Sequence, residues 1–173
     1  MPVAQKMEPG AREGILVALL HFADTRFTRA DLIFTGVDHS AGSYEVLVFL
    51  NNLKADDTTA HTLDSGYGGR FSIFGHGPCY GDVGHCEVPE RARDDLRPQH
   101  PLTPATKIVT ITDALRYVLS HSSDGLETVT LVPVTVPPRR ADRRVTSELF
   151  RFNDMTLRTY LAGTEHTLPS ARA

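Results

Sequence analysis

The sequence predicts a mainly β protein: an antiparallel, jelly-roll-like β-sandwich of about eight strands with one short helix. Three observations lead to this fold class. Short runs of β-branched, aromatic and other apolar residues recur along the chain, turn residues separate them, and a single segment has helical spacing. With 173 residues, of which 40% are hydrophobic and 23% charged, the chain has the size and composition of one globular domain.

Four strands are expected in the first part of the chain. The first is apolar enough to be buried on both faces, whereas the fourth alternates, with Phe71 and Ile73 on one face and Phe74 on the other. These strands are predicted at residues 15–22, 30–35, 44–50 and 69–74. Residues 51–68, which include Asp56 and Asp57, are expected to form a solvated loop.

The second part contains the helix, which directly follows the fifth strand. Thr112 or Asp113 can cap its start, apolar residues recur at helical spacing as far as His121, and residues 122–125 (SSDG) end it. The four strands of this part, counted from the fifth strand on, are predicted at residues 107–112, 127–134, 147–152 and 155–160.

The domain organisation follows from where these patterns stop. We expect a flexible lead-in over residues 1–11, a single β-sandwich domain over 12–162 and a flexible tail over 163–173. Within the domain, residues 75–104 form a long irregular loop without a strand pattern. About thirty such residues inside a compact domain usually indicate function or disorder.

Charge and hydropathy exclude some classes of partner. The 18 Lys and Arg against 21 Asp and Glu give a formal charge of −3, which argues against a nucleic-acid-binding protein. No apolar run approaches the roughly 20 residues that span a bilayer, and no signal peptide is recognisable, so no membrane association and a cytoplasmic location are expected.

The densest group of chemically active residues lies in the long irregular loop. His76, Cys79, His85 and Cys86 fall within eleven positions, and thiolate and imidazole are ligands that suit Cu(I) and Zn(II). His100, held between two prolines near the end of the loop, is a further candidate ligand. The spacing matches no known zinc finger, and a Cys79–Cys86 disulfide closing a small loop is an equally weighted alternative.

Catalytic motifs are missing from the sequence. There is no Gly-x-Ser-x-Gly elbow, no P-loop, no dinucleotide-binding glycine motif and no His-Glu-x-x-His helix. We therefore expect no catalytic residues and no enzyme activity, although a small thiol or zinc activity of an unrecognised kind stays open.

The order of the segments resembles a known family. The runs YEVLVFLNN, GYGGRFSIFGHG, KIVTITDALRYVL and ETVTLVPV look like the carboxy-terminal β-sandwich domain of type-3 copper proteins, that is, of tyrosinases, polyphenol oxidases and molluscan haemocyanins. The resemblance covers roughly residues 26–160. It rests on short motifs, among them Tyr67, Gly69, Phe71, the TDAL helix start at 112–115 and Val132-Pro133.

The resemblance implies a non-catalytic accessory domain of a copper-dependent phenol oxidase. In this family the domain lies over the entrance of the dicopper site, where one bulky side chain occupies the place of the substrate; Tyr67, Phe74 and Tyr80 are the candidates here, while Phe71 fits a core residue better. Some fungal relatives carry a cysteine pair that is thought to load copper, which implies a metallochaperone role for the Cys/His loop. The dicopper histidine domain itself is missing, so it would have to be supplied by a partner subunit or domain.

A second function of another class remains open. The same β-sandwich could serve as a protein-interaction module with a structural Cys79–Cys86 disulfide and no metal. Its open sheet edges also make an oligomer plausible.

Overall fold

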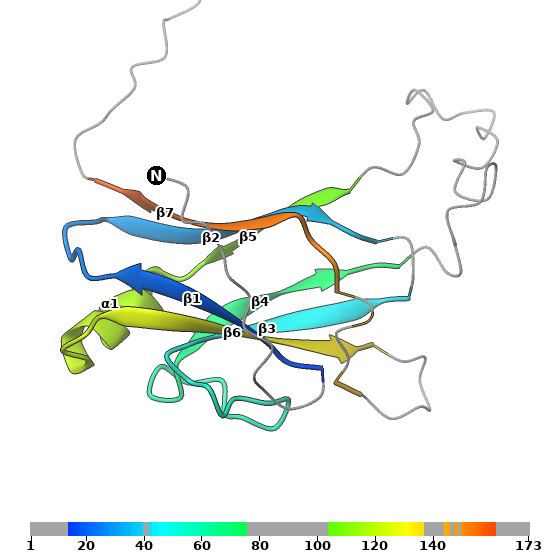
Figure 1. Cartoon of the computed structure of the whole chain (residues 1–173), viewed down its shortest axis with the longest axis horizontal. Helices are drawn as coiled ribbons and strands as arrows, with labels where there is room; N and C mark the ends of the chain where they lie inside the picture. Colours follow the sequence, from blue (N-terminus) through cyan, green and yellow to red (C-terminus); the bar gives the residue numbers. More distant parts are fainter. Residues whose placement is uncertain are drawn as a thin grey trace, which may run out of the picture.

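A computed structural model describes residues 14–39, 42–75, 104–136, 144–145, 148 and 150–161. These residues form seven strands and one helix (Figure 1). The elements are β1 (Leu16–Phe22), β2 (Arg29–Val37), β3 (Tyr44–Leu50), β4 (Tyr67–Ile73), β5 (Ala105–Thr110), α1 (Thr112–His121), β6 (Leu126–Thr135) and β7 (Asp154–Tyr160). No described helix is long and apolar enough to cross a membrane.

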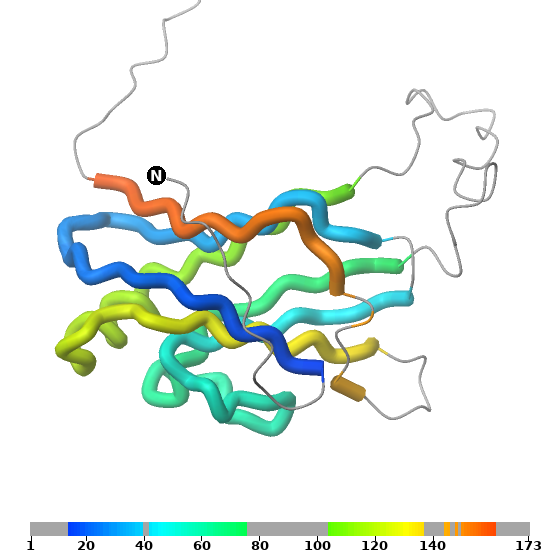
Figure 2. The backbone as a smooth tube through the Cα atoms, viewed as in Figure 1, coloured from blue at the N-terminus to red at the C-terminus, as the bar shows by residue number. Residues whose placement is uncertain are grey.

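The strands form two stacked antiparallel sheets, which confirms the predicted fold class. Sheet A has the strand order β1-β6-β3-β4 and sheet B the order β5-β2-β7. Figures 1 and 2 show the two layers, with α1 at one end of the sandwich and the start of β3 and the end of β4 at the other. The strands before and after residues 38–43 therefore belong to different sheets.

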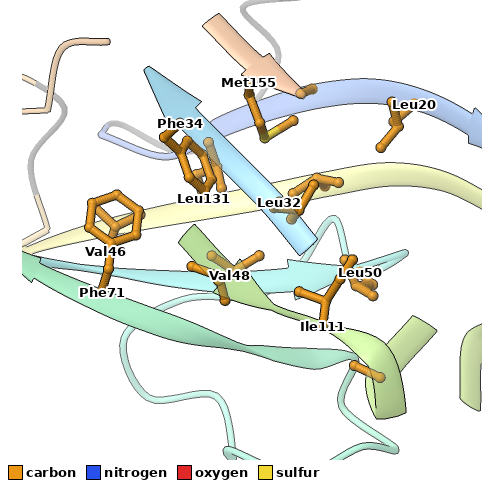
Figure 3. Close-up of a cluster of buried hydrophobic side chains, with 14 of the residues drawn as sticks. Leu20, Leu32, Phe34, Val46, Val48, Leu50, Phe71, Ile111, Leu131 and Met155 are labelled. Atoms are coloured by element: carbon orange, nitrogen blue, oxygen red, sulfur yellow. The ribbon is translucent and has the colours of Figure 1, made fainter. Parts of the chain in front are cut away.

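The main core lies between the sheets, as alternation along the strands requires. β2 contributes Leu32 and Phe34, and β3 contributes Val46 and Val48, all with no exposed surface (Figure 3). Phe71 joins them from β4, with its ring centroid 5.1 Å from that of Phe34. This confirms the expectation that Phe71 is a core residue.

β3 is buried on both faces, because a second apolar cluster covers the outer face of sheet A. Leu47 and Phe49 of β3 pack there with Val132 and Val134 of β6 and with Ala55. Ala55 belongs to the loop after β3 and is completely buried. The expectation that residues 51–68 form a solvated loop was therefore wrong in part, because this loop closes the outer side of the sheet.

Two local predictions are corrected at the ends of elements. α1 covers the predicted range, but its N-cap is Ile111 without a side-chain cap hydrogen bond. The Thr112 hydroxyl instead accepts a hydrogen bond from the backbone N–H of Ala30 at 3.0 Å and so ties the helix to β2. β5 also ends at Thr110, two residues earlier than predicted, because the helix takes over the chain there.

The predicted strand at residues 147–152 is not formed over the residues of it that the structure describes, Glu148 and 150–152. Tertiary packing replaces strand pairing: the rings of Phe150 and Phe152 stack at 4.8 Å and both contact Phe34. Among the described residues, the Asp38 N–H donates a backbone hydrogen bond to the Arg151 carbonyl, and the N–H of Asn153, directly after this segment, donates one to the Thr35 carbonyl.

A buried carboxylate organises the outer face of sheet B. Asp31 is 1% exposed, and its oxygens accept hydrogen bonds from Arg29 at 3.0 Å and from the Thr110 hydroxyl at 2.9 Å. Burial by itself raises the pKa of Asp31, but these bonds, the charge of Arg29 and a hydrogen bond from Tyr160 outweigh it and lower the pKa below its ordinary value. One ionised side chain thus links all three strands of sheet B.

Replacing this carboxylate tests the link. We expect Asp31→Asn to lower the free energy of unfolding by about 1–3 kcal/mol at pH 7, since a charged hydrogen-bond acceptor is lost from a buried site. Because the folded pKa lies below the unfolded value of about 3.9, the stabilisation is present above about pH 4 and is lost as the pH falls through the folded pKa. Urea denaturation at pH 7 and pH 3 should therefore show a smaller difference between the two proteins at pH 3 than at pH 7.

The matched control is Asp57→Asn, in an exposed part of the loop after β3. It should change the free energy of unfolding by less than about 0.5 kcal/mol. An Asp31→Asn protein as stable as the wild type at pH 7 would contradict the role of the carboxylate.

Candidate functional site

An exposed aromatic residue marks the end of sheet A opposite to α1. Phe74 directly follows β4 and is 87% exposed, the largest exposed fraction among the described large hydrophobic residues. Val136, which directly follows β6, is 48% exposed at the same end. Ser43 lies between Phe74 and Val136. We call these three residues the Phe74 end.

The strand register holds these three residues side by side. Ile73, Tyr44 and Thr135 are paired across β4, β3 and β6, so the next position of each strand is Phe74, Ser43 and Val136. The Ser43 carbonyl accepts a hydrogen bond from the Val136 N–H at 3.0 Å, and the Ser43 hydroxyl accepts one from the Gly75 N–H at 3.1 Å. The backbone under Phe74 is therefore fixed although its side chain is exposed.

Tyr44 anchors this end in the core. Its side chain is 1% exposed, its ring lies 6.0 Å from that of Phe150, and its hydroxyl donates a 2.7 Å hydrogen bond to the Asp38 carbonyl. Burial raises the pKa of Tyr44 strongly, and the charge of Asp38 raises it further. Tyr44 is thus a neutral hydrogen-bond donor that ties the connection after β2 to the start of β3.

Alternation along β4 shows which face Phe74 occupies. Phe71 and Ile73 point into the core, so Arg70, Ser72 and Phe74 lie on the outer face of sheet A. On that face the Arg70 guanidinium pairs with the Glu45 carboxylate at 2.8 Å. The exposed ring therefore lies on the same face as a matched ion pair, a combination of apolar anchor and polar surroundings typical of protein interfaces.

The other described candidate for shielding, Tyr67, lies at the opposite end of β4. Tyr67 and Phe74 are seven residues apart along an extended strand, which corresponds to a distance of about 20 Å. Its ring is stacked on that of His61 at 4.3 Å and contacts Phe49 edge to face at 5.5 Å. Tyr67 is half-buried, and this burial raises its pKa. The structure thus does not bring the two candidates together, and Tyr67 packs as part of the outer apolar cluster.

The third shielding candidate and the whole Cys/His group lie outside the described residues. These are Tyr80 and the proposed metal ligands His76, Cys79, His85, Cys86 and His100. The described part of the chain contains no group of three or more His, Cys, Asp or Glu that could hold a metal ion. Phe74 lies two residues before His76, the first residue of the Cys/His group.

Sequence reasoning missed two features that only the folded chain displays. One is the Asp31 network, in which Arg29 and Asp31 lie on one face of β2; their spacing of two was the available signal. The other is a groove between α1 and the loop after β3, which depends on tertiary packing and had no sequence signal.

The comparisons with known proteins include a match to a solved structure. No family model matches the chain, and no curated protein matches it. Among solved structures the chain is similar to a latent aurone synthase, a polyphenol oxidase, with 15% sequence identity and a TM-score of 0.47. The match covers 84% of this chain and 24% of that one, so the chain spans about a quarter of the length of the matched protein.

The matched protein is a polyphenol oxidase, which is the class of protein that the sequence motifs resemble.

A pair of substitutions separates surface from core on β4. Phe74→Ser should change the free energy of unfolding by less than about 0.5 kcal/mol, since the ring is exposed. Phe71→Ala, three residues earlier, should cost about 3–5 kcal/mol, since it removes a buried ring in contact with Phe34 and Phe150. Chemical denaturation measures both. A large loss with Phe74→Ser would show that Phe74 serves the fold and is not available to a partner.

Proposed function

We propose that this chain is a non-catalytic accessory domain of a copper-dependent phenol oxidase. It would dock on a tyrosinase-like dicopper domain or subunit and shield the copper site. The observation that carries this proposal is Phe74, an 87% exposed aromatic ring on a rigid strand end. The sequence resemblance to the carboxy-terminal domain of type-3 copper proteins supports the choice of partner.

Physical chemistry favours docking through the Phe74 end. Burying one phenylalanine side chain contributes about 1.5–3 kcal/mol to association. Val136 adds apolar surface beside it, and the ion pair between Arg70 and Glu45 needs no new partner on docking. Since the backbone of Ser43 and Gly75 is already hydrogen-bonded, little conformational entropy is lost when Phe74 is covered.

Copper delivery is the second part of the proposal. His76, Cys79, His85 and Cys86, with His100 as a further candidate, would hold Cu(I). This donor set suits the ion, because thiolates bind it firmly and imidazoles allow exchange toward the histidines of an oxidase. Zinc is the alternative metal for the same donors. The location of His76 two residues after Phe74 supports a link between shielding and loading.

Metal and thiol measurements test copper delivery. The reduced, metal-free protein should take up about one equivalent of Cu(I) in competition with a colorimetric chelator. A Cys79→Ser/Cys86→Ser double variant should lose this uptake, whereas the control His21→Ala, an exposed histidine on β1, should retain it. Uptake of Zn(II) but not Cu(I) would assign the loop to zinc. No uptake of either metal, with no free thiol before reduction, would contradict copper delivery and favour the disulfide-linked interaction module.

Inhibition of an oxidase tests shielding separately. The protein should slow the oxidation of a small phenol by a polyphenol oxidase catalytic domain prepared without its own accessory domain. Phe74→Ser should weaken this inhibition at least about tenfold, the equivalent of one buried aromatic side chain.

The matched control is Tyr67→Phe, which keeps the ring that packs on Phe49 and should inhibit like the wild type. Equal inhibition by Phe74→Ser and wild type would remove Phe74 from the interface. Failure of the wild-type protein to inhibit or bind the catalytic domain would overturn the accessory-domain proposal.

A further inference from the structure

A groove lies at the opposite side of the molecule from the Phe74 end, between the C-terminal half of α1 and the loop after β3. Its volume is about 200 Å³, far more than the roughly 10–15 Å³ needed to hold one water molecule. The loop contributes Leu63 and Asp64 to its walls, and the helix contributes Tyr117 and His121. The proposed function uses none of these residues.

Asp64 gives the groove a negative charge. The Thr62 side chain donates a hydrogen bond to its carboxylate, and backbone N–H groups of Asp64 and Ser65 also donate to it, which together lower the pKa of Asp64 below its ordinary value. Asp64 is therefore ionised at neutral pH. No lysine or arginine is among the described residues that line the groove, so its walls do not neutralise this charge.

His121 offers a second acceptor. Its Nδ1 lies 2.8 Å from the Tyr117 carbonyl oxygen, and because a carbonyl can only accept, this contact is a hydrogen bond in the tautomer that has its proton on Nδ1. In that tautomer Nε2 has the lone pair. The Ser120 hydroxyl, 2.9 Å from Nδ1, lies on the same side of the ring. The ring also stacks on that of Tyr117 at 4.1 Å, so the side chain is held in place.

The helix itself adds to the negative potential. α1 has ten residues and ends at His121, and Ser122, which follows, is also part of the groove wall. The unpaired carbonyl groups at a helix C-terminus carry a partial negative charge that favours cations. Carboxylate, imidazole lone pair and helix end thus all favour one kind of ligand, a positively charged hydrogen-bond donor.

Two arginines elsewhere in the described part of the molecule illustrate how a guanidinium combines a ring with an oxygen acceptor. The Arg29 guanidinium lies 5.6 Å from the Tyr160 ring centroid while it pairs with Asp31. The Arg116 guanidinium lies 5.6 Å from the ring centroid of Phe27 and donates to the carbonyl of that residue. A planar guanidinium can contact a ring and bind a carboxylate or carbonyl at the same time, which a lysine ammonium does less well.

We propose that this groove binds a guanidinium group, with Asp64 as its counter-ion, His121 as an added acceptor and the Tyr117 ring as an apolar wall. The group would come from an arginine side chain of a partner segment or from a small free guanidine. This site is independent of the Phe74 end, so it can fail or hold without affecting the accessory-domain proposal.

Nuclear magnetic resonance of the full-length protein, labelled with nitrogen-15, tests the site with N-acetyl-arginine amide as the probe. Saturable shifts are expected for the backbone amides of Ser65, Tyr117 and Ser122, with a dissociation constant in the millimolar range that is usual for one small group. The neutral analogue N-acetyl-citrulline amide should bind at least about tenfold more weakly, because it lacks the charge. Equal binding of the two probes, or no saturable shift at these amides, would overturn the proposal.

Variants locate the counter-ion. Asp64→Asn should weaken binding of the arginine probe about five- to tenfold, and His121→Ala about two- to threefold. Asp57→Asn, which removes an equal charge from the same loop but not from the groove wall, should bind like the wild type. If Asp57→Asn weakens binding as much as Asp64→Asn, only diffuse charge is involved and the site is refuted.

A third measurement distinguishes the two sources of the guanidinium group. Agmatine represents a small free guanidine, and the tripeptide Gly-Arg-Gly represents a partner segment. Tighter binding of the tripeptide supports a protein partner, and tighter binding of agmatine supports a small molecule. A failure of both to bind contradicts the site itself.

Discussion

The structure depends on covering β3 from both sides. Every residue from Tyr44 to Leu50 is buried, so this strand needs an apolar layer above it and another below. Sheet B supplies the first, mainly through Leu32 and Phe34. The loop after β3 supplies the second, with Ala55 against Leu47 and Phe49.

The chain leaving β3 must therefore turn back under its own strand before it forms β4. It does so with the Leu50 N–H bonded to the Gly66 carbonyl at 2.7 Å, where the positive φ of Gly66 allows its Cα to approach the Leu50 carbonyl.

This arrangement gives the two ends of the sandwich different chemistry. At the end where β3 starts, hydrogen bonds around Ser43 fix the backbone next to Phe74, whose ring is exposed. At the end where β3 stops, the covering loop meets α1 and forms a groove with a carboxylate and an imidazole in its wall. An apolar surface is recognised by shape and burial, whereas the groove is recognised by charge. The same folding constraint thus gives one small domain two surfaces of different chemistry.

Much of the fold could be predicted from the sequence, because strand alternation and helix spacing are local properties. Residues 44–50 and the helix ending at His121 were placed correctly for this reason. The errors arise where tertiary contacts override a local pattern. The apolar run containing Phe150 is typical of a strand, yet the two rings of that segment are held by Phe34 and not by a neighbouring strand. The Thr112 hydroxyl could cap the helix, but it instead accepts a hydrogen bond from the backbone N–H of Ala30, which is distant in sequence. Of the candidate site, Phe74 was named through the family resemblance, and alternation placed it on the face opposite to Phe71. The separation of Tyr67 from Phe74 follows from the strand length alone. The Cys/His group lies outside the described residues, and its assignment stays a prediction.

Sheet B has a consequence for how the chain is assembled during synthesis. Its central strand β2 pairs with β5 and with β7, whose residues lie about 75 and 125 positions further along the chain. Closing such long loops is costly in entropy before the contacts that reward it exist. Sheet B cannot be completed until residue 160 has left the ribosome. Until then β7 is missing, and β2 has only β5 beside it. A chain with this strand order is therefore exposed to aggregation longer than a helical domain of the same length, and protection of Leu32 and Phe34 during that interval falls to sheet A or to a chaperone.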